Sequence, residues 1–125
     1  MGGKLRMGMG YLMIFGSLAL FLSAISLAWG EDLAPGKKLF EGKCAQCHGK
    51  DAKGVAKMAK VLKVEPNAVD LTREEAAKLT TAEKLKIVSD GKKKMPKYKG
   101  KLTDEEIQSA VKYLESLQGG GAKKK

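Results

Sequence analysis

The residues Cys44-Ala45-Gln46-Cys47-His48 decide how this 125-residue chain is interpreted, because they contain both of its cysteines and its only histidine. Two thiols separated by two residues can reach the two vinyl groups on one edge of a porphyrin and form thioethers with them. The adjacent histidine then comes under the iron as its proximal ligand. This spacing is typical of c-type haem attachment, so we expect Cys44 and Cys47 to bind one haem c covalently and His48 to bind its iron.

Two other kinds of site use cysteines at this spacing. A thioredoxin-like redox pair needs a strand–helix–strand frame, and the sequence shows no convincing alternation of apolar and polar residues. A tetrahedral zinc site needs four ligands, whereas the two cysteines and the histidine supply three that are crowded together. The sequence therefore favours haem attachment over both alternatives.

The first thirty residues differ in composition from the rest of the chain. Lys4 and Arg6 precede an uncharged run over residues 7–30, and all 14 acidic residues follow that run. A positive start, an apolar run and small residues near Ala28 predict a secretory signal peptide. The run is also long enough to span a bilayer as an uncleaved membrane anchor. Either form exports residues 31–118, to the bacterial periplasm or to the periplasmic face of the inner membrane.

The exported part, residues 31–118, is predicted to be one all-α domain of four to five short helices. We expect one helix to start at Pro35 and run to about Lys43, and another over residues 55–62, ahead of Pro66. In a capping box, a threonine and a glutamate three residues later satisfy free backbone N–H groups at a helix start. Three such boxes predict further helix starts: Thr72 with Glu75, Thr80 with Glu83, and Thr103 with Glu106.

The last helix is predicted to present a single apolar stripe to the core. Its apolar residues recur at helical spacing: Ile107, Ala110, Val111, Leu114 and Leu117. Gly119 suits the left-handed position that ends a helix. We expect the Gly/Lys tail over residues 119–125 to be flexible. Few aromatic residues are available, so the predicted core is thin, and a large apolar cofactor would complete it.

Both ends of this domain resemble a known family. Residues 36–48 (GKKLFEGKCAQCH) are similar to the opening helix of the small, single-haem class I cytochromes c. Residues 91–107 (GKKKMPKYKGKLTDEEI) are similar to their methionine loop and the start of their terminal helix. The resemblance covers about residues 33–117 and implies a cytochrome c fold wrapped around one covalently bound haem.

The resemblance also implies a close crossing of the first and last helices. Gly36 and Phe40 of the first would meet Tyr113 and Leu114 of the last. Residue by residue this is physically sensible, because a glycine lets two helix backbones approach closely and the apolar stripe of the last helix needs a partner.

Met95, which is followed by Pro96, matches the second axial iron ligand of that family. A thioether is a soft, neutral ligand, and Gly91 ends the preceding helix, so Met95 falls on a connector. Met58 is the rival, but it lies on an apolar helical stripe, where packing is the commoner role. Residues 92–94 are lysines, where many family members have a glycine or another small residue. The loop is therefore bulky and positive, and a neutral lysine amine becomes an alternative iron ligand at high pH.

Lysines crowd the residues around Met95. The chain carries a net charge of +10, and six of its lysines stand close together: Lys92, Lys93, Lys94, Lys97, Lys99 and Lys101. They form either a solvated loop or a positive collar that steers acidic redox partner proteins to the haem edge. We expect no nucleic-acid binding, since the chain is exported and lacks aromatic platforms beside the lysines. Membrane contact is expected only if the N-terminal segment is retained, and the chain is predicted to be a monomer.

The ligand set predicts the function. With His48 and Met95 both bound, the iron has no vacant site for a substrate, so we predict a one-electron carrier and not an enzyme. It would shuttle electrons between exported or membrane-bound redox proteins. The alternatives are a haem enzyme or gas-binding sensor with a labile distal ligand, and a fixed, anchored subunit of a respiratory complex. Tyr98 and Arg73 are candidates for contacting the haem propionates, because they are polar and near the motifs.

Overall fold

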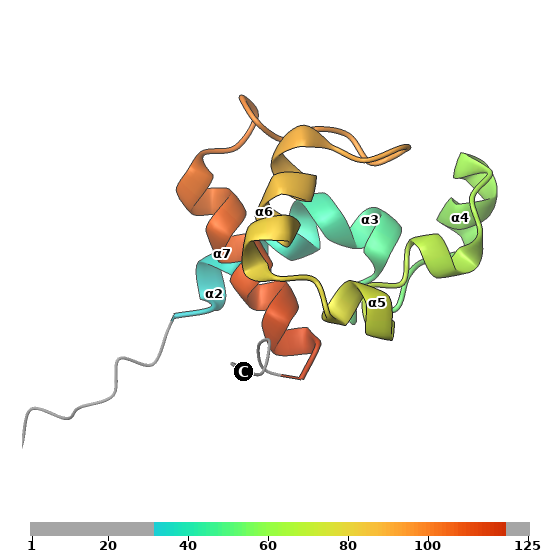
Figure 1. The fold of residues 1–125 in the computed structure, drawn as a ribbon, viewed down its shortest axis with the longest axis horizontal. Coiled ribbons are helices and arrows are strands. Elements are labelled where there is room, and N and C mark those ends of the chain that lie inside the picture. The colour runs from blue at the N-terminus through green and yellow to red at the C-terminus, as the bar shows by residue number, and fades with distance from the viewer. Residues whose placement is uncertain (1–31, 120–125) are drawn as a thin grey trace, which may run out of the picture. The chain divides into compact units, whose positions relative to one another are not determined.

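The computed structural model describes residues 32–119, so the predicted signal or anchor segment over residues 1–30 lies outside it, as does the tail from residue 120 onward. The described part is all-α, as predicted, and its elements follow in this order (Figure 1): α2 (Ala34–Leu39), the π-helical turn η2 (Phe40–Cys44), α3 (Ala45–His48), α4 (Ala56–Leu62), the 3-10 turn η3 (Pro66–Ala68), α5 (Glu74–Ala77), α6 (Thr81–Asp90) and α7 (Asp104–Leu117). Among residues 32–119, no helix has the length and apolar character needed to cross a membrane.

The first helical stretch carries the cysteine motif. Pro35 occupies its first turn, as predicted, and α2, η2 and α3 follow one another without a break, so the helix runs past the predicted end at Lys43 to His48. In the π-helical turn, the backbone N–H of Ala45 donates to the carbonyl of Phe40, five residues earlier. Counting this stretch once, the described chain has five helical stretches besides η3, in agreement with the predicted four to five.

The first and last helices cross closely, as predicted. A Cβ atom built on Gly36 would lie 2.7 Å from the carbonyl carbon of Ser109 on α7 and overlap its oxygen, so only glycine fits there. One turn further along, the rings of Phe40 and Tyr113 pack edge to face with their centroids 5.6 Å apart. Phe40 and Leu114 belong to the same buried cluster. The crossing therefore fixes the start of the cysteine-bearing stretch against α7.

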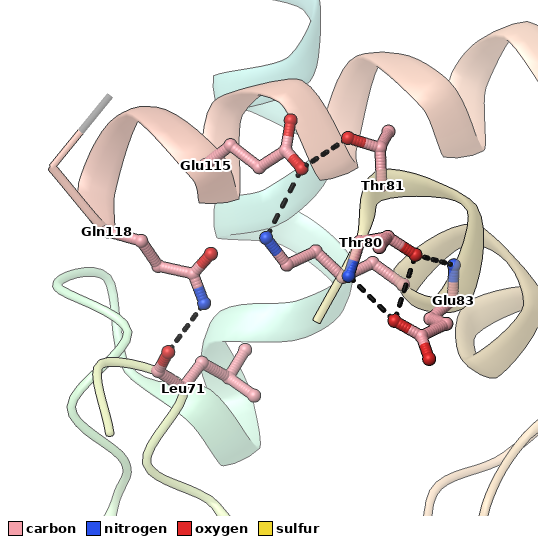
Figure 2. Close-up of polar contacts among 7 residues, drawn as sticks. Leu71, Thr80, Thr81, Glu83, Glu115 and Gln118 are labelled. Carbon is pink, nitrogen blue, oxygen red and sulfur yellow. Dashed lines mark hydrogen bonds and ion pairs between the residues drawn. The ribbon is translucent and has the colours of Figure 1, made fainter. Parts of the chain in front are cut away.

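Two of the three predicted capping boxes are present. Both partners of each box make their hydrogen bonds at the start of α6 and of α7: Thr80 with Glu83, and Thr103 with Glu106. Figure 2 shows the first of them. The box predicted at Thr72 is wrong, because α5 begins only at Glu74 and has Arg73 as its cap residue. The hydroxyl and the backbone N–H of Thr72 donate instead to the carboxylate of Asp70, at 2.6 and 2.8 Å. Asp70 lies only two residues before Thr72, so it accepts the hydrogen bonds of Thr72 in place of a capping interaction.

The core is small and is built mainly on α7. The predicted stripe is buried at Ile107, Ala110, Val111 and Leu114 and partly buried at Leu117. Helix α6 packs on α7 through a buried ion pair, in which Lys84 Nζ lies 3.2 Å from Glu115 Oε1. Thr81 donates to the same carboxylate oxygen at 2.8 Å (Figure 2). The predicted helix over residues 55–62 is present as α4, and its Ala59 is fully buried.

Candidate haem site

Two adjoining cavities lie beside the cysteine motif. The larger has a volume of about 530 Å³ and the smaller about 90 Å³. Six residues line both of them: Cys44, His48, Leu71, Leu79, Ile87 and Met95. The larger volume falls within the range of about 300–1,000 Å³ that is typical of cofactor sites. The residues common to both cavities are mostly apolar, so the site suits a large apolar group.

His48 is held at the cavity by a buried backbone carbonyl. Its Nδ1 lies 2.8 Å from the carbonyl oxygen of Val69, which is only 5% exposed. A carbonyl only accepts, so Nδ1 carries the proton, and Nε2 keeps the free lone pair that a metal ion needs. Burial lowers the pKa of His48 more than this hydrogen bond raises it, which favours the neutral ring. The sequence offers no signal for Val69, which lies 21 residues away.

The loops on both sides of Val69 fix its carbonyl. The turn η3 ends at Ala68, and Val69 is its cap residue. Two residues later, the backbone N–H of Leu71 donates to the carbonyl of Ala52 at 2.8 Å. On the other side, the N–H of Gly54 donates to the carbonyl of His48 at 2.7 Å. Backbone hydrogen bonds therefore hold the segment around Val69 and the end of α3, which carries His48, in place relative to residues 52–54.

Both cysteines line the larger cavity as free thiols. Burial raises the pKa of the Cys44 thiol to about 11, and the neighbouring Cys47 adds to the rise. The thiol of Cys44 is therefore protonated at neutral pH. A protonated thiol is a poor nucleophile compared with a thiolate. Within the described part of the chain, neither sulfur is engaged with another side chain, and both lie at the wall of one cavity, where the edge of a porphyrin could reach them.

Met95 reaches the same cavity from a loop between α6 and α7. The backbones of Lys92 and Met95 pair in both directions, with N–H···O distances of 3.2 and 2.9 Å, and the turn between them places Lys93 at a φ of 53°. Gly91 ends α6, as predicted, with a φ of 77° that few other residues adopt. Met58 lies on α4 and is not among the residues that line either of the two cavities.

The larger cavity thus brings together all four residues predicted from the sequence to hold the haem: Cys44, Cys47, His48 and Met95. Tyr98 and Arg73, predicted as candidates for contacts with the propionates, line it as well. Arg73 donates to the carbonyl of Asn67 at 2.8 Å and to Glu75 at 3.0 Å. All six lysines of the methionine loop are exposed, and those at positions 92–94 line the cavity.

Gln118, which lines the smaller cavity, provides a further test of the fit. Its Nε2 donates to the carbonyl of Leu71 at 2.6 Å (Figure 2), which orients the amide. Its Oε1 is buried and has no partner among the described residues, and the side chain lines the smaller cavity. Buried acceptors without partners are rare in native proteins, and a further bound group at the cavity would supply the missing donor or contact. Two thiols, one neutral imidazole and one thioether around an apolar space fit a haem c.

Comparisons with known proteins find similar sequences over most of the chain. Residues 31–114 match the family described as cytochrome C oxidase, cbb3-type, subunit III. The chain is 36% identical over 99 residues to cytochrome c6 of Thermostichus vulcanus, which covers 78% of this chain and 81% of that protein. It is also 36% identical over 83 residues to cytochrome c6 of Leptolyngbya boryana, which covers 66% of this chain and 89% of that one.

This chain belongs to the cytochrome c family. The resemblance inferred from residues 36–48 and 91–107 is confirmed, and the family assignment together with the cysteine spacing gives a small mono-haem class I cytochrome c with one covalently bound haem c. In this cytochrome the matched residues include the whole cysteine motif and the methionine loop. The match ends at residue 114, just before Glu115 and Gln118.

Proposed function

We propose that this cytochrome is a one-electron carrier in which Cys44 and Cys47 bind the haem covalently and His48 and Met95 bind its iron. When bound, the haem supplies the single chemical step, which is the gain or loss of one electron at its iron. The observation that carries the proposal is the shared cavity that these four residues line.

The residues of this chain support electron transfer more than catalysis on a substrate. His48 offers Nε2 as a ligand because Val69 holds its other ring nitrogen, and that hydrogen bond also fixes the ring plane. Met95 faces the same space from the opposite loop, so it would occupy the position that an enzyme or gas sensor must keep open. We therefore favour the carrier over these alternatives, and we infer that the chain is not an enzyme.

Replacement of Met95 by alanine tests the ligand set. The oxidised parent should show the charge-transfer band of a sulfur-to-iron bond, and Met95→Ala should lose that band and bind carbon monoxide rapidly when reduced. Met58→Ala is the matched control, because Met58 lies on α4 and is not among the residues lining either cavity, and it should keep the band. Mass spectrometry of the purified chain should show one covalent haem. A colourless parent, or a band that survives Met95→Ala, contradicts the proposal.

We propose further that the exposed lysines of the methionine loop steer an acidic redox protein to this side of the molecule. All six are exposed, and three border the cavity that would hold the haem. A concentrated positive field raises the rate of association with anionic partners, and salt weakens the effect. The lysines would act on the encounter and not on the electron transfer itself.

Small redox reagents of opposite charge test this proposal. The double variant Lys92→Glu/Lys94→Glu should slow oxidation of the reduced protein by ferricyanide and flatten the dependence of the rate on salt. It should not slow oxidation by the cationic tris(phenanthroline)cobalt(III) ion. Lys37→Glu/Lys38→Glu makes the same change in net charge on α2 and should have a smaller effect. Equal effects of the two double variants would mean that net charge alone matters.

The first thirty residues are proposed as the export signal or anchor that delivers residues 31–118 to the periplasm. The mass of the protein purified from a periplasmic extract distinguishes the two forms, since cleavage removes about thirty residues. A full-length product found only in the membrane fraction would identify the anchored form.

A further inference from the structure

One hydrogen bond joins the methionine loop to the segment that carries the cysteines. The hydroxyl of Tyr98 donates to the backbone carbonyl of Lys43 at 3.0 Å, across 55 positions of sequence. Lys43 immediately precedes Cys44 and lies in the π-helical turn η2. Tyr98 follows Met95 by three positions. The bond therefore ties the neighbourhood of the proposed distal ligand to the neighbourhood of the proposed thioethers.

The backbone of Tyr98 is itself held in place. Its N–H donates to the carbonyl of Val88 on α6 at 3.1 Å. Its carbonyl accepts from the N–H groups of Lys101 and Leu102, at 2.8 and 3.0 Å. A side chain on a fixed backbone can hold another segment, whereas one on a free loop would move with it. Met95 is then fixed on one side by its pairing with Lys92 and on the other by Tyr98.

The side chain of Tyr98 is half-buried, and its hydroxyl remains a hydrogen-bond donor at neutral pH. The side chain lines the larger cavity together with Cys44, Cys47 and Met95. Burial raises the pKa of Tyr98, so the hydroxyl keeps its proton at neutral pH. The six exposed lysines of this loop repel one another, which favours an open loop unless contacts hold it closed.

We propose that Tyr98 is a positioning residue, whose hydroxyl bond to Lys43 holds the methionine loop against the cysteine-bearing segment and so limits the release of Met95 from the iron. The inference rests on the proposed role of Met95 as the distal ligand. Tyr98 does not act on the electron transfer; it sets how often the distal position opens.

Imidazole binding to the oxidised holoprotein measures that opening, because added imidazole binds the iron only after Met95 has left. Tyr98→Phe removes the hydroxyl and keeps the ring in place. An intramolecular hydrogen bond of ordinary strength changes an equilibrium about fivefold, so Tyr98→Phe should bind imidazole about fivefold more tightly. The charge-transfer band should remain in the absence of imidazole. Tyr113→Phe is the matched control, since Tyr113 packs on Phe40 and is not among the residues that line either cavity, and its imidazole affinity should equal that of the parent.

The outcomes separate this inference from the proposed ligand set. If Tyr98→Phe binds imidazole within about twofold of the parent, the proposed positioning role of Tyr98 is wrong, even if the variant is less stable in urea unfolding. If Met95→Ala binds imidazole no more tightly than the parent, Met95 is not the distal ligand and the proposed ligand set fails first. If Tyr113→Phe tightens imidazole binding as much as Tyr98→Phe does, the effect comes from a general loss of stability, and the proposed positioning role of Tyr98 is again wrong.

Discussion

The two walls of the haem cavity are built in different ways. The proximal wall consists of the continuous helical stretch over residues 34–48, which packs against α7, and of Val69, whose backbone carbonyl accepts a hydrogen bond from His48. The distal loop, residues 91–102, is irregular and lysine-rich, and it is held by a few backbone bonds and by Tyr98. The proximal wall is fixed by packing, and the distal loop is fixed by single hydrogen bonds.

This difference indicates which of the two proposed iron ligands would exchange. Packing of the proximal wall cannot be undone without separating α2 from α7, which costs a large part of the stability of a domain this small. Each hydrogen bond of the distal loop contributes only about 1 kcal/mol, so the loop can open while the rest stays folded. The histidine side is expected to be permanent and the methionine side to be the adjustable one.

The largest effect is expected at the crossing of α2 and α7. Gly36→Ala places a Cβ against the carbonyl of Ser109, so the two backbones must separate, and unfolding by urea should show a loss of about 3 kcal/mol or more. Gly42→Ala is the matched control, because a Cβ at Gly42 meets nothing within 4 Å. That variant should be as stable as the parent or more stable by up to about 1 kcal/mol. Equal losses in both variants would contradict the close crossing.

A second, smaller effect is expected where α6, which leads into the distal loop, meets α7. Lys84→Met leaves the carboxylate of Glu115 without its ammonium partner, although Thr81 still donates to it. Because the side chain of Glu115 keeps 13% of its surface exposed, we expect a loss of about 2 kcal/mol, less than for a fully buried pair. The double variant Lys84→Met/Glu115→Leu should recover most of that loss in urea unfolding. A double variant weaker than the single one would contradict this account.

The cysteine motif and the helices α6 and α7 were predictable from sequence, because short motifs encode them directly. Spacing alone identified the thiols and His48 as one group. Helical periodicity identified the apolar face of α7, and threonine with glutamate marked the starts of α6 and α7. These are local signals, in which the interacting residues lie within a few positions of one another.

The parts that sequence could not predict depend on contacts between distant segments. No residue pattern joins His48 to Val69, Lys84 to Glu115, or Tyr98 to Lys43, since each pair meets only after folding. Thr72 fits the capping pattern but lies two residues after Asp70, and the nearer carboxylate accepts its hydrogen bonds. A pattern of two residues cannot report such a competitor.

A change at Lys93 is expected to tighten the distal loop by a modest amount. Lys93 has a φ of 53°, a left-handed conformation that is energetically unfavourable for a residue with a Cβ atom but not for glycine. Lys94 does not have a left-handed φ. Lys93→Gly should raise the free energy of unfolding by about 0.5–1 kcal/mol, while Lys94→Gly should lower it by a similar amount. Urea unfolding measures both, and imidazole binding should weaken only in Lys93→Gly. Changes of the same sign in both variants would contradict the turn geometry.

The smallest effect is expected at Asp70, next to the carbonyl that supports the proximal wall, and it depends on pH. The hydroxyl and then the backbone N–H of Thr72 hold the pKa of Asp70 below its usual value of 3.8. Folding therefore favours the ionised carboxylate, and this stability is present above pH 3.8 and is lost as the pH falls through the folded pKa. Asp70→Asn keeps an acceptor oxygen and removes the charge. Its urea midpoint should lie slightly below that of the parent at neutral pH, because solvent screens the half-buried carboxylate, and the two midpoints should converge in acid. A difference that stays constant from neutral pH into acid would mean that the charge of Asp70 does not stabilise this turn.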